Sequence, residues 1–315
     1  MFNVIAQEFI MKVAVIGGTG FVGFHLVRHL IAAGHLPRLL VRPGSEGKIE
    51  RIADCEIVHG HVGDSATLTD CLAGADAVIY LIGILREFPA RGITFEALQH
   101  QGVVDTIAAA QATGVGRFLL MSANGIRADG TPYQCTKYQA ELALKASVLR
   151  WTIFRPSVIF GDPQGRMEFC SQLKKDIIDS PLPAPLFFKG LLPTGAGTFE
   201  LAPVSVEDVA KAFVIALAEP RTESQTYSLC GPQRYTWKAI LSTIAAASGK
   251  TKLMAPAPAL AVQAVAGVFD RYSWFPISRD QIQMLMEGNV CTENDSFARL
   301  GLTPTPFGVD QLQYL

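Results

Sequence analysis

The stretch VAVIGGTGFVG, residues 13–23, decides the fold, and it runs on into FHLVRHLIAA, residues 24–33. Four apolar residues, a run rich in glycine and then apolar residues at helical spacing indicate a strand, a tight turn and a helix. Glycines let the backbone bend sharply and approach a pyrophosphate closely, while a helix N-terminus offers free N–H donors. The stretch therefore predicts the phosphate-binding turn of a dinucleotide-binding domain.

The same alternation of apolar strand and amphipathic helix continues up to about residue 160. Strands are expected at 13–16, 39–41, 56–58, 77–83, 118–122 and 152–154, and helices at 21–33, 65–72, 95–112 and 133–147. This order predicts an α/β fold with a Rossmann-like, doubly wound parallel sheet that carries helices on both faces. Each connection is long enough for a right-handed crossover.

The rest of the chain predicts a smaller, mainly helical C-terminal substrate lobe. We expect residues 11–160 to form the NAD(P)-binding Rossmann domain, residues 161–203 and 231–315 to form the lobe, and residues 204–230 to pack back onto the first domain. Helices are expected at 206–218, 237–247, 258–269, 280–287 and 295–300, a short strand at 227–229, and loop in the proline- and glycine-rich stretch 180–197. The helix at 258–269 is apolar nearly all round, which predicts that it is buried against the body, packed on a partner or placed over an apolar ligand, and burial is the default expectation.

Composition and charge exclude several classes of partner. The 315 residues are 49% hydrophobic, and 27 basic against 28 acidic residues leave a net charge of -1. No overall field therefore favours nucleic acid or an anionic membrane surface. No apolar run reaches the roughly 20 residues of a membrane span, and the opening MFNVIAQEFI does not resemble a signal peptide. We expect a cytoplasmic protein, and leave peripheral membrane or complex association and the oligomeric state open.

The cysteines and histidines predict no metal site. No CxxC pair occurs, which argues against a zinc knuckle, a redox pair or a disulfide framework, and core thiols are expected. The cysteines are Cys55, Cys71, Cys135, Cys170, Cys230 and Cys291. His25 and His29 stand four apart on the first helix without a persuasive third ligand. His59 and His61 alternate along the third strand, where packing or hydrogen-bonding roles are expected.

The end of the second strand bears on the choice of cofactor. An acid there would bind a ribose 2′-hydroxyl, whereas a base would accommodate a 2′-phosphate. This strand ends in Val41 and Arg42, about 20 residues after the glycines, and Ser45 and Lys48 follow closely. The pattern favours NADP(H) over NAD(H). The alternative is a solvated surface arginine.

A candidate for chemistry stands in YQCTK, where Tyr133 and Lys137 are four apart on one face of a helix. A lysine ammonium and an oxidised nicotinamide nearby would stabilise phenolate, so the tyrosine could exchange a proton with a carbonyl or alcohol. Lys137 could also bind the nicotinamide ribose. Ser122, at the C-terminal end of the fifth strand, could hold the substrate oxygen. The alternative is that the pair are surface groups of an amphipathic helix.

Taken together, GGTGFVG, the YxxxK pair and FRPSVIFG at 154–161 resemble the extended and atypical short-chain dehydrogenase/reductases of the NAD-dependent epimerase/dehydratase family. RFLLMSANG from Arg117, APVSVEDVA from Ala202 and the ending LGLTPTPF are similar to the branch of bacterial proteins that resemble an accessory subunit of respiratory complex I. The match spans nearly the whole chain after Met11.

The resemblance implies a set of nucleotide contacts. It places NAD(P) at Gly17, Thr19, Gly20, Phe21 and Val22, and gives Tyr133 and Lys137 a base or ribose contact. Such proteins often hold the adenine with an aspartate after the third strand, where this chain has His61 and Val62, with Asp64 three residues beyond His61. Many members carry an asparagine and small residues after the fourth strand, where this chain has Leu81, Ile82 and Gly83.

Two functions are compatible with these observations. In the first, the protein transfers hydride between NADP(H) and a carbonyl, alcohol or quinone-like apolar small molecule, with Tyr133 as the acid, Lys137 tuning it and Ser122 orienting the substrate. In the second, it is a non-catalytic nucleotide-binding protein that stabilises a complex, assists assembly or senses the redox state, and the same residues only bind ribose.

Overall fold

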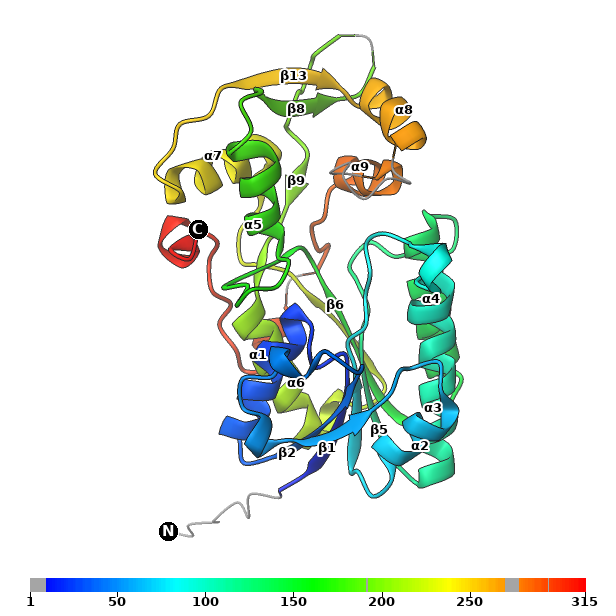
Figure 1. Ribbon diagram of the computed structural model, residues 1–315. Helices are drawn as coiled ribbons and strands as arrows, with labels where there is room; N and C mark the ends of the chain where they lie inside the picture. The colour runs from blue at the N-terminus through cyan, green and yellow to red at the C-terminus, as the bar shows by residue number, and fades with distance from the viewer. Residues whose placement is uncertain (1–9, 191, 270–277, 294) are drawn as a thin grey trace, which may run out of the picture.

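The computed structural model describes residues 10–190, 192–269, 278–293 and 295–315, and seven parallel strands in these ranges form one sheet (Figure 1). The strand order is β11-β6-β5-β4-β1-β2-β3. The strands are β1 (Lys12–Ile16), β2 (Leu36–Val41), β3 (Glu56–His59), β4 (Ala77–Tyr80), β5 (Arg117–Met121), β6 (Arg150–Pro156) and β11 (Gln225–Leu229). The order reverses at β1, where open sheets of this kind bind their ligands. The expected Rossmann-like sheet is confirmed.

Helices cover both faces of this sheet, as Figure 1 shows. One face carries α1 (Phe21–Ala32) and α6 (Val206–Ala218), and the other carries α2 (Ser65–Leu72), α3 (Gly102–Thr113) and α4 (Pro132–Lys145). Because successive side chains of a strand point to opposite faces, Val13 and Val15 join the core under α1 and α6, while Ala14 and Ile16 join the other. A strand buried on both faces therefore reads as an unbroken apolar run.

Helix α4, which carries the YxxxK pair, has a well-defined start. The Thr131 hydroxyl accepts from the Gln134 backbone N–H, and the Gln134 side chain accepts from the Thr131 backbone N–H. This capping box begins the helix at Pro132, one residue before the expected start. The helix expected at 95–112 is divided into a π-helical turn, η4 (Glu96–Gln101), and α3.

The lobe combines helices with short strand pairs. Its helices are α5 (Phe169–Leu173), the π-helical η5 (Lys174–Ile178), α7 (Trp237–Ala247), α8 (Ala259–Phe269), α9 (Arg279–Glu287) and α10 (Ser296–Arg299). Its strand pairs are β9 (Glu200–Leu201) with β12 (Tyr235–Thr236) and β8 (Ala184–Phe188) with β13 (Met254–Pro258). A further pair, β7 (Ile159–Phe160) with β10 (Val204–Ser205), lies at the boundary between the lobe and the first domain. Strand β8 lies inside the stretch expected to be loop.

Helix α8 departs from the expectation of burial. Ala259 and Ala266 are buried, but the Leu260 side chain is 71% exposed. Although α8 is apolar in composition, it therefore packs on the lobe through some of its described side chains and exposes others to solvent. Among the described residues, no helix combines the length and the apolar character needed to cross a bilayer.

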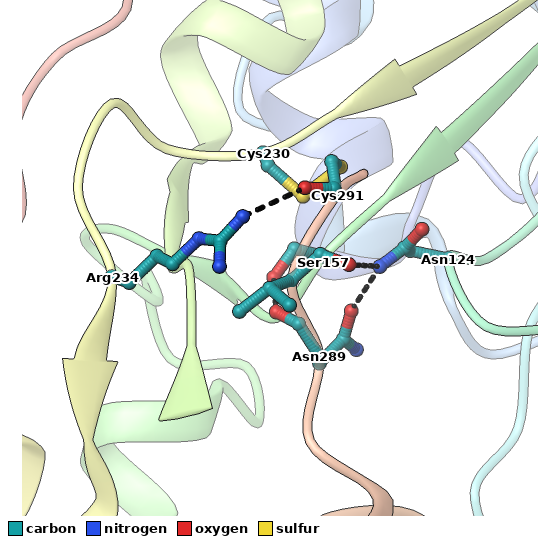
Figure 2. The surroundings of a disulfide bond; sticks show 7 residues. Asn124, Ser157, Cys230, Arg234, Asn289 and Cys291 are labelled. Carbon is teal, nitrogen blue, oxygen red and sulfur yellow. Dashed lines mark hydrogen bonds between the residues drawn. A yellow bond between two sulfur atoms is a disulfide. The ribbon is translucent and has the colours of Figure 1, made fainter. Parts of the chain in front are cut away.

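The expectation that all the cysteines are core thiols is wrong for one pair. Cys230, just after β11, forms a disulfide with Cys291, which follows α9, and the two Cα atoms are 6.0 Å apart (Figure 2). The other cysteines are free thiols, and Cys71 and Cys170 among them are buried. The spacing of the cysteines in the sequence did not predict this disulfide, because the two segments meet only in the folded chain.

Candidate functional site

The glycine turn joins β1 to α1 at the carboxyl edge of the sheet. Gly17 has φ +96°, and a Cβ atom on it would lie 3.3 Å from the backbone nitrogen of Ile82. Gly20 precedes the first residue of α1 and has no side chain to cap it. The N–H groups of the first helical turn, at Phe21 and Val22, therefore begin a helix whose positive end lacks a side-chain partner. This is the arrangement that accepts a phosphate.

The chain leaving β4 passes next to this turn. The Leu81 backbone N–H donates to the Ile16 carbonyl oxygen (2.9 Å), which holds the segment against β1. Gly83 follows, and a Cβ atom on it would lie 3.5 Å from Lys137 Nζ. The fourth-strand motif and the phosphate turn are thus neighbours, as the sequence-based site requires.

Lys137 is held at the carboxyl ends of two central strands. Its Nζ donates to the carbonyl oxygens of Ile82 (3.1 Å) and Met121 (3.0 Å), and its side chain is only 2% exposed. Burial lowers the pKa of Lys137 to about 8, although the charge on Glu141 acts in the opposite direction. Lys137 therefore lies beside the segment that contacts the glycine turn, and its ammonium is poorly solvated.

Tyr133 lies one helical turn before Lys137. Its half-buried ring packs edge-on against the Phe95 ring, with the ring centroids 5.9 Å apart. Burial raises the pKa of Tyr133 to about 12. The phenol is therefore protonated at neutral pH in this structure, and the phenolate expected from the sequence would need a further positive charge.

Ser122 lies where the fifth strand ends, but its hydroxyl lies beside a buried ion pair. Burial opposes ionisation of Glu141, yet the hydrogen bonds and charge of Arg155, with a contribution from the Ser122 hydroxyl, hold the pKa of that carboxyl below its usual range. Arg155 donates to both Glu141 oxygens, at 2.8 and 2.6 Å. The Ser122 hydroxyl is 4% exposed in this environment and makes no hydrogen bond of good geometry with a described residue.

The segment that returns from the lobe borders the same edge of the sheet (Figure 2). Asn124 Nδ2, two residues after Ser122, donates to Asn289 Oδ1 (2.7 Å) and to the Val290 carbonyl oxygen (3.1 Å). Ser157 Oγ donates to the Asn289 carbonyl oxygen (3.1 Å). The disulfide lies immediately beyond, so this boundary of the site is held by polar and covalent contacts.

Helix α9 is anchored to the first turn of α4. Arg127 donates two hydrogen bonds to the Glu287 carboxylate, at 2.9 and 2.6 Å, and Gln134 Nε2 donates to the same carboxylate (3.0 Å). Hydrogen bonds from Arg127 hold the pKa of Glu287 below its usual range. The lobe is thereby attached next to the turn of α4 that carries Tyr133.

Arg42 leaves the end of β2 with an exposed side chain that meets no partner in the described ranges. A cavity of about 710 Å³ opens between the glycine turn and the loop after β2. Its lining comprises Thr19, Gly20, Phe21, Phe24, Gly47, Lys48, Glu50 and residues 164–167. Lys48, a basic residue after β2, therefore lines a hollow that reaches the phosphate turn.

Arg166 lines this cavity, and the sequence analysis missed it. Its Nε donates to the Thr19 carbonyl oxygen (3.1 Å), its Nη2 donates to the Lys48 carbonyl oxygen, and its guanidinium lies 4.2 Å from the centre of the Phe24 ring. Arg166 thus joins the glycine turn to the loop after β2. It lies 147 positions from Thr19, so no local pattern could have revealed it.

The residues after β3 differ from the expectation. The strand ends at His59, so His61 lies in the following loop, exposed, and the expectation that both histidines alternate along one strand is wrong. Val62 is buried in the core. Asp64 accepts from the backbone N–H groups of Ala66 and Thr67 and caps α2, so its carboxylate is already engaged.

The histidines of the first helix are hydrogen-bonded. Glu207 of α6 contacts His25 Nδ1 (2.7 Å) and His29 Nε2 (2.5 Å), and the hydrogen bonds from both rings hold the pKa of that carboxyl far below its usual range. These contacts join α1 to α6. Within the part of the chain that the structure describes, no cluster of histidine, cysteine and carboxylate side chains could hold a metal ion.

Comparison with known proteins places these features in a family. Residues 17–177 match the family model described as NAD(P)H-binding. The chain is 28% identical to a ceramide reductase from Caulobacter vibrioides over 83% of this chain and 78% of that protein. It is 24% identical to the 40 kDa subunit of NADH-ubiquinone oxidoreductase from Neurospora crassa over 96% and 78% of the two chains.

Among solved structures, a UDP-glucose 4-epimerase from Thermotoga maritima has the same fold. Its TM-score is 0.71 at 17% identity, with 96% of this chain and 97% of that chain covered. The resemblances to epimerase-type folds and to a complex I subunit, expected from the sequence, are confirmed.

Proposed function

The chain belongs to the NAD(P)H-binding family, and on that premise we propose that it transfers hydride between NADP(H) and an apolar carbonyl or alcohol compound. One observation carries this proposal. Lys137 Nζ is held by the carbonyl oxygens of Ile82 and Met121, beside the glycine turn and one helical turn from Tyr133. The phosphate turn, a ribose-binding lysine and a proton donor therefore follow one another along one edge of the sheet.

Each residue takes a role that its surroundings support. The backbone N–H groups at Phe21 and Val22 would bind the pyrophosphate, and Gly17 and Gly20 let it approach. Lys137 would donate hydrogen bonds to the nicotinamide ribose. The bound nicotinamide supplies or accepts the hydride. Tyr133, which burial keeps protonated, would donate its proton to the carbonyl oxygen as that oxygen gains negative charge.

The preference for NADP(H) follows from charge after β2. The Arg42 side chain is exposed and meets no partner in the described ranges, and Lys48 lines the cavity that borders Thr19. A 2′-phosphate bound there would gain charge-assisted hydrogen bonds that a 2′-hydroxyl cannot match. Through its contacts with Thr19 and Lys48, Arg166 would hold the two sides of this subsite together.

The substrate would lie between the sheet edge and the lobe, residues 161–203 and 231–315, because that lobe is anchored beside α4 through Glu287. The ceramide reductase relative supports an apolar, lipid-like compound as the substrate. Ser122 is the weakest part of the proposed set, since its hydroxyl lies beside the Glu141–Arg155 pair.

A second function is favoured by a different observation. The chain spans 78% of a complex I subunit, and burial raises the pKa of Tyr133 to about 12, which does not favour the phenolate. A protein that binds NADP(H) without turnover, as an accessory, assembly or redox-sensing component, would need nothing more from the site than ribose and phosphate contacts.

One experiment separates these functions. Calorimetry would measure the binding of NADPH and NADH, and nicotinamide absorbance would follow turnover with a panel of quinones, aldehydes and ketones. Binding with turnover of at least one apolar carbonyl supports hydride transfer. Binding without turnover across the panel supports the accessory role, and no binding of any nicotinamide nucleotide rejects both.

A further inference from the structure

The segment that leaves β4, residues 82–87, carries a cation, Arg86, for which the described part of the chain supplies no hydrogen-bond partner at two of its nitrogens. The Nε and Nη2 atoms of Arg86 are buried and make no hydrogen bond with any described residue. A guanidinium has five N–H donors and stays charged at any physiological pH. The Arg86 side chain as a whole is half-buried, and buried donors left unpaired in a native protein require a physical reason.

A second buried polar group, Gln99, contacts the same segment. Gln99 is fully buried in the π-helical turn η4, and its Nε2 donates to the Ile84 carbonyl oxygen (2.8 Å), two residues before Arg86. Its Oε1 has no hydrogen-bond partner among the described residues. Turns of π-helix occur often at functional sites. Arg86 thus has unpaired donors, and the helical turn that contacts its segment has an unpaired acceptor on Gln99.

Both ends of this segment are attached to the candidate site. At one end, the Ile82 carbonyl oxygen accepts from Lys137 Nζ (3.1 Å). At the other, Glu87 Oε1 accepts from the Phe95 backbone N–H (2.7 Å), and the Phe95 ring packs against Tyr133. Arg86 is therefore placed between the contact to the proposed ribose-binding lysine and the contact to the proposed proton donor.

We propose that Arg86 binds an oxyanion of the substrate, a carboxylate or a phosphate. This inference rests on the proposed hydride transfer and narrows its substrate class to anionic oxo compounds with an apolar remainder. The bound oxyanion supplies the counter-charge that Arg86 lacks, and it fixes the carbonyl group relative to Tyr133.

The test uses two ligands that differ only in the anionic group, benzoylformate and acetophenone, together with inorganic phosphate. Their binding to the protein–NADPH complex is measured by calorimetry for wild type, Arg86→Ala, Arg86→Lys and the control Arg91→Ala. Arg91 belongs to the same connection and stacks on the Phe88 ring at 6.0 Å, outside the segment. NADPH affinity, NADPH oxidation and the thermal midpoint are recorded for each variant.

We expect wild type to bind benzoylformate at least tenfold more tightly than acetophenone. Arg86→Ala should lose this difference, Arg86→Lys should keep part of it, and Arg91→Ala should keep all of it, while NADPH affinity stays within twofold. The ligand-free Arg86→Ala protein should unfold at the same or a higher temperature, because two buried nitrogens without hydrogen-bond partners have been removed. A loss of phosphate binding alone would identify a phosphate as the anion.

Several results would overturn the inference. They are a preference for benzoylformate that survives in Arg86→Ala, an equal loss of NADPH affinity, a thermal midpoint lowered in both Arg86 variants, or a wild-type complex that binds neither benzoylformate nor phosphate. Anion binding that depends on Arg86 without any NADPH oxidation would instead reject the proposed hydride transfer and leave the anion site standing.

Discussion

Gly23 packs directly on Gly17, because a Cβ atom at position 23 would lie 2.3 Å from the Gly17 carbonyl oxygen. Gly23→Ala must therefore push α1 away from the phosphate turn. We expect a loss of about 1–3 kcal/mol in the free energy of unfolding and a large loss of NADPH affinity, measured by urea denaturation and calorimetry. At Gly116 an added Cβ atom would make only ordinary contacts. Gly116→Ala should change neither quantity, and an unaffected Gly23→Ala would contradict this packing.

Tyr133→Phe removes the proposed proton donor and keeps the ring that packs against Phe95. Turnover of a carbonyl substrate should fall by about 100-fold or more, the range that general acid catalysis supplies. NADPH affinity should stay within a few-fold. Tyr138→Phe, on the same helix, serves as the control and should leave turnover unchanged. Equal turnover by Tyr133→Phe and wild type would reject Tyr133 as the acid.

Arg42→Glu replaces an attractive charge with a repulsive one where the 2′-phosphate is expected. The affinity for NADPH should fall by at least tenfold, and the affinity for NADH should change little, because NADH lacks that phosphate. Fluorescence titration with both nucleotides measures the ratio. Arg51→Glu, in an exposed pair with Asp54, provides the matched control. A loss of the same size for both nucleotides would refute the assignment of Arg42.

The pH dependence of nucleotide binding should reflect Lys137, whose pKa burial lowers to about 8 in the free protein. If its ammonium donates to the ribose, affinity should be constant below pH 8 and fall by up to tenfold per unit above it. Calorimetry between pH 6 and about pH 9.5 measures this profile. Lys137→Met should bind weakly with no such alkaline fall, and a wild-type profile that is flat above pH 8 would remove the proposed contact.

The same lowered pKa also bears on stability. The unfolded chain holds the Lys137 proton up to its ordinary pKa of 10.5, whereas the folded protein releases it near 8. The unfolded state therefore binds more protons between these values, and this residue makes the free energy of unfolding rise with pH in that window. Urea denaturation of wild type and Lys137→Met at pH 7.5 and 9.5 tests the sign, and Lys137→Met should lack the increase.

The disulfide between Cys230 and Cys291 closes a long loop, since the two residues are 61 positions apart. Replacing both by alanine should lower the free energy of unfolding by about 2–4 kcal/mol. Guanidinium denaturation without reductant measures the change, with Cys135→Ala, a half-buried free thiol, as the control. An unchanged midpoint in the double variant would show that the bond adds nothing to stability.

Local sequence predicted those parts of the fold in which a single short pattern identifies the element. Residues 13–16 read as a buried strand and the glycines as a turn, and α6 was expected at its observed bounds, 206–218. Strand β8 was missed because Pro185 and the prolines of its partner β13 remove backbone donors, which is untypical of a paired strand. The π-helical turn η4 was not predicted, because over six residues the change from the α-helical to the π-helical repeat does not alter the pattern of apolar residues enough to be recognised.

The site was predictable only where its residues are neighbours in sequence. The glycine turn and the YxxxK pair each form one short pattern, so the sequence could predict both as candidates. Arg166, the return segment at Asn289 and the disulfide reach the site from distant parts of the chain, and contacts of that kind follow from packing, not from local pattern. The burial of the Ser122 hydroxyl likewise depends on Arg155 of the neighbouring strand.

Ile82 contacts both halves of the proposed nucleotide site. A side chain at Gly17 would touch both the backbone nitrogen and the Cγ1 atom of Ile82, and the Ile82 carbonyl oxygen holds Lys137. The spacing between the phosphate turn and the proposed ribose lysine is thus set by a single residue. A substitution at position 82 that shifts its backbone should therefore alter the distance that a dinucleotide must span.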